Sequence, residues 1–273
     1  MENADAIVLR TVDFSETSLI LTLFTRQFGK IEALAKGGRR LKSPFESALD
    51  ILTRIRVSFL HKKNNTLDLL TEAKLIRRFR VVESNLAGLF ASYYVVELVD
   101  SVTEINDPNP ALYDLTVKIL ARLEQGTLLM RSLIRFEGLL LKTIGQQPSL
   151  ENCAECGTTI NSNFHTENTE QKRVAFGYID GGALCVRCAK LLRQTEHGKF
   201  LTSISTNALH GMKLLTDPLD KTENWKQIKL EQNVQNEIRG IHNHYFSHLL
   251  GRRPRLYDWL NFIAQNDKEI IQK

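Results

Sequence analysis

The 273-residue sequence has no long apolar segment and no secretory signal. No apolar run approaches the roughly 20 uncharged residues that a membrane-spanning helix needs. Residues 1–5 lack the succession of basic, apolar and small residues that marks a secretory signal. We therefore expect a cytoplasmic protein with no membrane partner, in a compartment where thiols stay reduced.

The sequence also lacks the short motifs that accompany most catalytic sites. It contains no nucleophile beside a general base, no carboxylate pair at a useful spacing and no phosphate-binding glycine motif. The glycine-containing stretch 36–44 does not have the G-x4-G-K-[ST] spacing of a Walker A loop. These absences favour a binding protein over an enzyme.

Composition and charge indicate a globular protein with one basic region. Apolar residues make up 42% of the chain and charged residues 25%. Residues 1–80 contain 15 Lys and Arg against 9 Asp and Glu, a net charge of +6, whereas residues 81–273 contain 21 against 22, a net charge of −1. A concentrated basic surface attracts a polyanion through counterion release, although a solvated face has the same composition.

The first 80 residues show the pattern of short strands. We predict strands at residues 5–12, 17–25, 30–35, 50–60 and 67–73. The stretch 50–60 alternates apolar and polar residues with the period of two that a half-buried strand requires. Five short strands in such a length predict a small closed barrel, and the OB-fold is the commonest such barrel that binds nucleic acid.

Beyond residue 80 the apolar period becomes that of amphipathic helices. We predict helices from about residue 86, with Ser84 or Asn85 as cap, and at 111–123, 128–144, 205–215, 230–250 and 256–264. The resulting fold class is an α+β multidomain protein. Its predicted domains are an OB-fold at 1–80, a helical domain at 81–149 and 196–273, and an inserted cysteine module at 150–195.

All four cysteines lie in the cysteine module. Cys153, Cys156, Cys185 and Cys188 form two C-x2-C pairs separated by 28 residues. Four thiolates complete the tetrahedral shell of Zn²⁺ and leave no open position, so the spacing predicts one structural zinc ion. The alternatives are four reduced thiols, two redox pairs, or His165 or His197 as substitute ligands. A redox pair normally opens a helix beside a βαβ unit, a context we do not find here.

Several basic residues are candidate DNA contacts. The basic loop, residues 36–42, contains Lys36, Arg39, Arg40 and Lys42. Arg10, Arg54, Arg56, Lys62 and Lys63 could widen the basic surface around it. Flexible cations in such a loop can follow a phosphate backbone. Phe14 is a candidate for base stacking, although an apolar residue at a turn commonly packs into the barrel.

Two further clusters lie on predicted helices. His242, His244 and His248 have no evident carboxylate partner, which favours a solvated helix face over a catalytic or metal site. Arg131 and Arg135 are four residues apart among leucines. They could receive an acidic partner, or their stems could cover a helix edge while the charges stay in water.

Four short stretches together resemble a known family. They are Ala35-Lys36-Gly37-Gly38-Arg39-Arg40, Ser15-Glu16-Thr17-Ser18, Gly145-x-x-Pro148-x-Leu150-x-x-Cys153-x-x-Cys156-Gly157, and Leu249-Leu250-Gly251-Arg252. In these motifs and in the order of its parts, the whole chain resembles the RecO family of bacterial DNA repair proteins.

The resemblance implies a recombination mediator that works without nucleotide hydrolysis. Such proteins bind single- and double-stranded DNA and anneal complementary strands. With RecR they help to load RecA onto single strands coated by single-stranded DNA-binding protein. Carried over to this chain, the basic loop becomes the leading DNA contact and the four cysteines become zinc ligands. Arg131 and Arg135 become candidates for binding the acidic tail of the single-stranded DNA-binding protein. The expected location is the cytoplasm, in association with the nucleoid.

Two other classes of function remain open at this point. One is a zinc-ribbon enzyme that acts on nucleic acid, such as a nuclease. The other is a zinc-dependent scaffold whose basic loop binds an acidic protein. Strand cleavage would identify the first class, and absence of DNA binding would identify the second.

Overall fold

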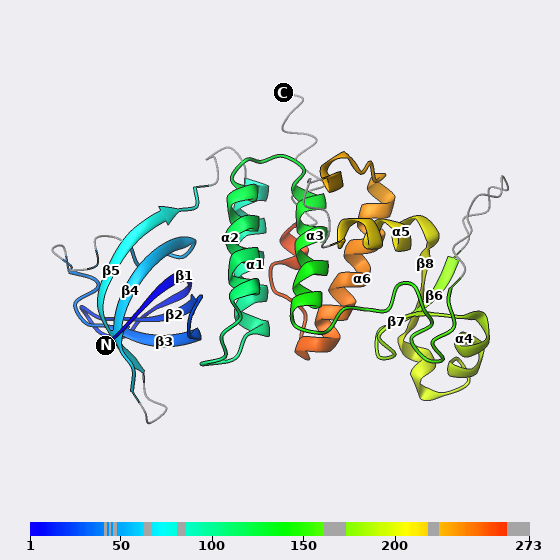
Figure 1. Cartoon of the computed structure of the whole chain (residues 1–273), viewed down its shortest axis with the longest axis horizontal. Helices are drawn as coiled ribbons and strands as arrows, with labels where there is room; N and C mark the ends of the chain where they lie inside the picture. The colour runs from blue at the N-terminus through cyan, green and yellow to red at the C-terminus, as the bar shows by residue number, and fades with distance from the viewer. Residues whose placement is uncertain are drawn as a thin grey trace. The chain divides into compact units, whose positions relative to one another are not determined.

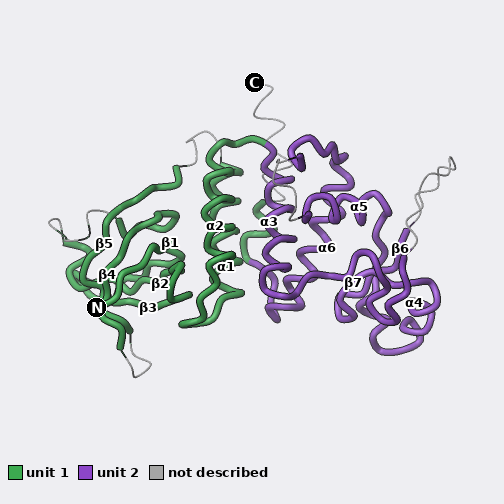
Figure 2. The backbone as a smooth tube through the Cα atoms, viewed as in Figure 1, with its two compact units in different colours: residues 1–127, 255–273 green, residues 128–254 purple. Residues whose placement is uncertain are grey.

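The computed structural model describes residues 1–40, 43, 45, 48–62, 67–80, 86–160, 173–217 and 224–260. The chain folds into two compact units (Figure 2). Unit 1 contains residues 1–127 and 255–273, and unit 2 contains residues 128–254. The cuts at 127/128 and 254/255 differ from the predicted domain boundaries, because the first two helices group with the N-terminal strands.

Unit 1 begins with a closed five-stranded barrel, which confirms the predicted fold class. Its strands are β1 (Glu2–Asp13), β2 (Leu19–Thr25), β3 (Gly29–Ala35), β4 (Thr53–Leu60) and β5 (Asp68–Arg78), in the order β1-β2-β3-β5-β4 (Figure 1). Only the β3–β5 pairing is parallel. The last strand extends beyond the predicted end at residue 73, because β4 continues to pair with it as far as Arg78.

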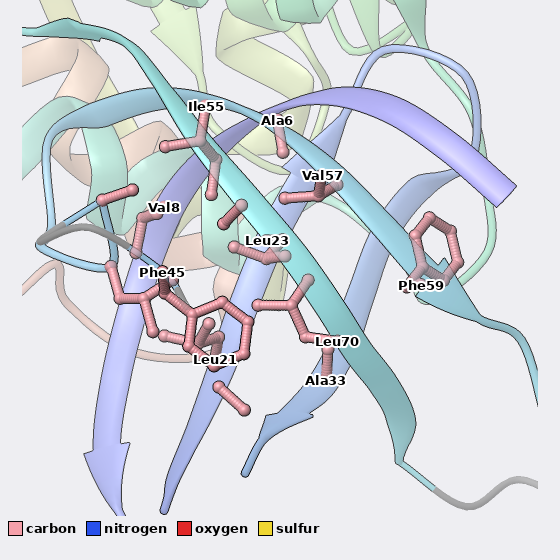
Figure 3. Packing of buried hydrophobic residues seen from close by; sticks show 14 of the residues in the cluster. Ala6, Val8, Leu21, Leu23, Ala33, Phe45, Ile55, Val57, Phe59 and Leu70 are labelled. Carbon is pink, nitrogen blue, oxygen red and sulfur yellow. The ribbon is translucent and has the colours of Figure 1, made fainter. Parts of the chain in front are cut away.

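Alternating side chains fill the barrel. Along β3, Ile31, Ala33 and Ala35 are buried, while the residues between them are partly exposed. Phe45, from the connection between β3 and β4, lies close to Leu21 in the same apolar cluster (Figure 3). Complete burial of a large apolar side chain contributes about 1.5–3 kcal/mol, so this interior stabilises a barrel with few residues.

Two further helices follow the barrel in unit 1, and residues 257–260, within the helix predicted at 256–264, are also helical. Helix α1 spans Leu86–Val102 and helix α2 spans Pro110–Leu123. Asn109 caps α2, since its side chain accepts the Leu112 N–H at 3.0 Å. The predicted caps of α1, Ser84 and Asn85, lie outside the described residues.

Specific contacts attach these helices to the barrel. The Arg26 guanidinium donates to both carboxylate oxygens of Asp114, at 3.0 and 3.1 Å. The rings of Phe24 and Tyr113 lie 5.9 Å apart between centroids. The Lys30 ammonium donates to the Asp100 carbonyl at 2.6 Å. Barrel and helices are therefore one packed unit.

Unit 2 consists of three long helices and a small antiparallel sheet. The helices are α3 (Leu129–Thr143), α5 (Thr206–Leu215) and α6 (Gln232–Leu250). The sheet has the order β7 (Gly182–Leu184), β6 (Arg173–Gly177) and β8 (Leu201–Ser205). The described part of unit 2 also contains helix α4 (Val186–Leu192) and two 3-10 turns, Glu196–Phe200 and Asn224–Gln227 (Figure 1). The sequence did not predict β7, α4 or β8, because each is too short to show a period.

The histidine cluster on α6 is split by burial. His244 and His248 are exposed, as predicted, but His242 is 1% exposed, so the prediction of a solvated face is wrong for this residue. Its Nδ1 lies 2.8 Å from Glu137 Oε2, and Arg239 Nη1 donates to Glu137 Oε1 at 2.7 Å. The carboxylate partner is 105 residues away in sequence, where local spacing cannot reveal it.

Within the described ranges, no helix combines the length and the apolar character that crossing a membrane requires.

Candidate nucleic-acid interface and metal centre

The fold brings the four cysteines of the module together. Ligand atoms of Cys153, Cys156, Cys185 and Cys188 all lie within 4.8 Å of one another. The sulfurs of Cys156 and Cys185 are 3.8 Å apart, far beyond the roughly 2.05 Å of a disulfide. A tetrahedron with Zn–S bonds of about 2.3 Å has sulfurs about 3.8 Å apart. The four side chains can therefore hold one metal ion.

Local backbone structure aims the sulfurs inward. Gly157, with φ of +74°, turns the chain after the first pair, and its N–H donates to the Cys153 carbonyl at 2.8 Å. The Cys153 sulfur accepts the Cys185 N–H at 3.3 Å, and the Cys185 sulfur accepts the Cys188 N–H at 3.4 Å. Backbone N–H groups, that of Cys185 among them, lower the pKa of the Cys153 thiol and so favour its thiolate, which is the form that binds a metal.

The thiols do not share one environment. Hydrogen bonds from the Thr158 side chain and backbone lower the pKa of Cys156 to about 6. A hydrogen bond with the Cys185 side chain raises the pKa of Cys188, and burial raises it further, to about 12. Clustered thiolates repel each other unless a cation lies between them, so the donor set suits a divalent metal.

The second cysteine pair lies at the start of a helix, which the sequence did not predict. Cys185 is the N-cap of α4, so the second pair does open a helix. The neighbouring strands β7, β6 and β8 pair with one another in antiparallel fashion, so the described strands of this sheet do not form the parallel βαβ unit of a redox fold. The convergence of both pairs on one point favours metal binding over two separate redox pairs.

The basic loop lies against the turn between β1 and β2. Arg39 donates its N–H to the Thr17 carbonyl at 3.0 Å, and its guanidinium lies 3.1 Å from the Asp13 carboxylate. Gly37 adopts a φ of +75°, which lets the loop reverse direction immediately after β3. Lys36 and Arg40 are exposed and form no ion pair with any described residue. Lys42 lies outside the described residues.

The other predicted DNA contacts are dispersed over the barrel. Arg10 pairs with Glu32 at 3.3 Å, and both Arg54 and Arg56 bind the Asp5 carboxylate, at 3.0 and 2.9 Å. Lys62 is exposed, with no ion pair in the described part of the chain. Lys63 falls outside the described ranges. Among the described candidates, the charges that no ion pair with a described residue offsets are therefore those of Lys36, Arg40 and Lys62.

An apolar row on the outside of the barrel was not predicted. It crosses all five strands in register through Val12, Ile20, Leu34, Leu69 and Leu60. Val12 is 46% exposed and Leu60 42% exposed, and the other three are half-buried. Strand alternation within β2 and β3 marks outward residues, but only the strand order shows that they align.

Cations and an aromatic ring flank this apolar row. Phe14, Lys36 and Lys62 each lie two residues beyond a member of the row, after Val12, Leu34 and Leu60. Phe14 is 59% exposed, so the alternative that it packs into the barrel is wrong. The face of strands 2 and 3, with the loops between strands 1 and 2 and between strands 4 and 5, is where OB-type barrels bind oligonucleotides.

Half of a second basic strip, on β4 and β5, was not predicted. Arg56 lies opposite Lys74, and Arg54 lies opposite Arg77. Like charges in directly opposed positions destabilise a sheet unless anions lie nearby. Arg54 and Arg56 were candidates, but Lys74 and Arg77 were not. They belong to the basic run from Lys74 to Arg80, which lies within the predicted OB-fold at 1–80 but beyond the predicted end of its last strand at residue 73.

Arg131 and Arg135 bind backbone carbonyls of their own unit. Arg131 donates to the carbonyls of Lys226 and Ile228, at 3.1 and 2.6 Å. Arg135 donates to the Leu215 carbonyl and lies over the Trp225 ring, 5.4 Å from its centroid. Both guanidinium groups thus contact the described parts of the connection between α5 and α6, at Leu215 and at residues 225–228.

Comparison with known proteins agrees with this architecture. Residues 1–79 match the family model described as Recombination protein O N terminal, and residues 83–257 match Recombination protein O C terminal. The DNA repair protein RecO of Rhodopirellula baltica is 34% identical over 275 residues, covering 93% of this chain and 97% of that protein. The DNA repair protein RecO of Myxococcus xanthus is 28% identical over 256 residues, covering 94% and 95%. The chain belongs to the RecO family of DNA repair proteins.

Proposed function

We propose that the protein is a non-enzymatic recombination mediator that binds single- and double-stranded DNA and anneals complementary strands. With RecR, it helps to load RecA onto DNA coated by single-stranded DNA-binding protein. It acts in the cytoplasm, in association with the nucleoid. The observation that carries this proposal is the outer face of the barrel, where exposed cations and Phe14 flank the apolar row.

The chemistry of this face suits a single strand better than a folded acidic protein. Phosphates can contact Lys36, Arg40 and Lys62, whose charges are not offset by described anions. Base faces can pack on Phe14 and on the apolar row, and such packing tolerates any sequence. Annealing needs this tolerance, because the protein must hold strands without selecting their bases.

We propose zinc as the metal of the cysteine module, in a structural role. Four thiolates are the ligand set of closed zinc sites, and no ligand position remains for a substrate. Metal analysis of the purified protein should find one zinc ion per chain. A normally folded protein without zinc would contradict this assignment.

We also propose that the acidic tail of the single-stranded DNA-binding protein binds near Arg131 and Arg135. Arg131 and Arg135 are half-buried and lie four residues apart on α3, on the same side of the helix, so one extended acidic tail can meet both charges. The double variant Arg131→Lys/Arg135→Lys keeps both charges but loses the planar set of N–H donors that matches a carboxylate. It should bind the tail peptide more weakly, and its melting temperature is measured alongside because the same side chains also bind backbone carbonyls. An unchanged dissociation constant would refute the assignment.

An annealing assay tests the main proposal. The zinc-loaded protein is mixed with labelled complementary strands, without nucleotide, across a salt series. The double variant Lys36→Ala/Arg40→Ala is more informative than one that includes Arg39, whose side chain also supports the loop through Asp13. We expect slower annealing and a salt slope for single-strand binding that is smaller by about 1.4, since each lost phosphate contact removes about 0.7.

The matched control is Lys142→Ala/Lys229→Ala, which removes two exposed cations from unit 2. It should anneal like the wild type. Equal loss in both double variants would reduce the effect to net charge and contradict a specific face. Cleaved strands would indicate a nuclease, and absence of DNA binding by the wild type would indicate a protein scaffold.

A further inference from the structure

The short helix α4 of the cysteine module exposes an unusual face. Four residues of the helix and the two residues after its end are exposed: Val186, Arg187, Lys190 and Leu191, then Arg193 and Gln194. Val186 is 73% exposed and Leu191 56% exposed, which is high for large aliphatic side chains. Cys188 and Ala189 are buried on the other side of the helix. At about 100° per residue, the exposed residues span a continuous arc of about 160°.

This face is cationic, although the module as a whole is not. Residues 151–200 contain six Lys and Arg and six Asp and Glu, so this part of the chain has no basic excess. The helix itself contains no acidic residue. Arg187, Lys190 and Arg193 form no ion pair with any described residue.

The acidic residues described in the module lie elsewhere. Glu196 pairs with Lys199, and Asp180 is buried, with His197 at 3.7 Å. Glu151 and Glu155 belong to the segment around the first cysteine pair. The described acidic residues therefore lie away from α4, although they are close to its cations in sequence. The charges of Arg187, Lys190 and Arg193 remain exposed on the helix face.

The order of side chains across the arc indicates which kind of partner fits. Lys190, Gln194 and Arg187 occupy its centre, Leu191 lies at one edge, and Val186 and Arg193 lie towards the other. Protein–protein interfaces have the opposite order, with an apolar core inside a polar rim. A cationic centre with one aliphatic side chain towards each edge fits a phosphate backbone along the middle and bases towards the sides.

We propose that the exposed face of α4 is a second binding site for single-stranded DNA. This inference rests on the proposed annealing function and extends it, since annealing requires two strands to be held at once. The barrel holds one strand, and α4 holds the other through Arg187, Lys190 and Arg193. The cysteine module then binds DNA in addition to binding a structural metal ion.

Binding of a second strand to the zinc-loaded full chain tests the proposal. The protein is first saturated with an unlabelled oligonucleotide, and a labelled, non-complementary oligonucleotide is then titrated across a salt series. The double variant Arg187→Gln/Lys190→Gln keeps side-chain length while removing two charges. We expect it to bind the first strand normally, to bind the second at least tenfold more weakly, and to lower the second-strand salt slope by about 1.4.

Three controls keep the result interpretable. The variant Lys142→Ala/Lys229→Ala removes two charges from the same unit and should behave like the wild type. The variant Arg187→Lys/Lys190→Arg preserves charge and should restore second-strand binding. Zinc content and melting temperature should be unchanged in all variants. If the glutamine variant loses zinc, normal second-strand binding by the charge-preserving variant still supports the site.

The possible outcomes separate this inference from the proposed function. Unchanged second-strand affinity and slope in the glutamine variant would overturn the α4 site. If the barrel variant Lys36→Ala/Arg40→Ala still slows annealing, the proposed function survives that result. If neither variant affects annealing, the proposed function fails as well. Loss of binding to an acidic peptide, with second-strand binding unchanged, would assign α4 to a protein partner and also overturn the proposal.

Discussion

At the scale of single residues, burial determines what a charged side chain contributes. Glu137 and the side chains of Arg239 and His242 are at most 2% exposed. A carboxylate that water cannot reach depends on its partners, and removing one member of such a buried set is far more costly than removing a surface pair. The same residue types on the outside of the barrel remain available to a ligand.

The buried group gives a prediction for stability. Glu137→Gln leaves the Arg239 guanidinium buried without its carboxylate, so we expect the free energy of unfolding to fall by about 3–5 kcal/mol. Chemical denaturation measures this change. The control Glu104→Gln changes an exposed carboxylate and should stay within about 0.5 kcal/mol of the wild type. A similarly small effect of Glu137→Gln would mean that the buried group of Glu137, Arg239 and His242 does not stabilise unit 2.

At the scale of elements, the turn before β3 makes a close backbone contact with the connection between α1 and α2. Gly29 begins β3 with a φ of +70°, a conformation that side chains other than glycine rarely adopt. A Cβ atom at this position would lie 2.1 Å from the Asp107 carbonyl oxygen, in the connection between α1 and α2. The close approach of two backbones, as well as the turn, therefore requires glycine here.

This turn predicts the outcome of a pair of substitutions. Gly145 has a similar φ of +73°, but nothing lies within 4 Å of its Cβ position. Gly145→Ala should cost about 1–2 kcal/mol from backbone strain alone. Gly29→Ala should cost at least about 1 kcal/mol more, because the Asp107 connection must also move. Equal unfolding free energies for the two variants would show that the connection yields without cost.

At the scale of the whole molecule, the chain has two compact units. The barrel and helices α1 and α2 belong to unit 1, and the cysteine module belongs to unit 2. The core of the barrel contains no cysteine, whereas Cys153 and Cys188 form part of a small apolar cluster in the module. Metal binding should therefore stabilise unit 2 and leave the barrel unaffected.

Metal removal tests this separation. A chelator should lower the melting temperature of unit 2 by about 8–16 °C. A ligand present at about 1,000 times its Kd contributes about 4 kcal/mol, and each kcal/mol lost lowers the melting temperature by roughly 2–4 °C. The affinity for the metal should fall with decreasing pH, because the Cys188 thiol, whose pKa is raised to about 12, must lose its proton to bind. Calorimetry, with single-strand binding by the barrel as control, measures both effects. Parallel loss of barrel binding would contradict independent units.

The sequence by itself determined the elements with a clear period and the groups defined by local spacing. The strands from β1 to β5 and the long helices alternate or repeat within a single segment, so their patterns are local. The two cysteine pairs are equally local, and their residue type already specifies a soft, tetrahedral metal site. The basic loop was identified for the same reason, as a run of cations beside glycines.

Only the tertiary structure decided which side chains are exposed and which neighbours they have. The burial of His242 beside Glu137, the alignment of the apolar row across five strands, and the cationic face of α4 all join residues that no short window connects. The physical reason is that solvent exposure and cross-strand register depend on segments far away in the chain. A residue's type gives its chemistry, but the packing of distant segments determines whether that chemistry reaches water, a buried partner or DNA.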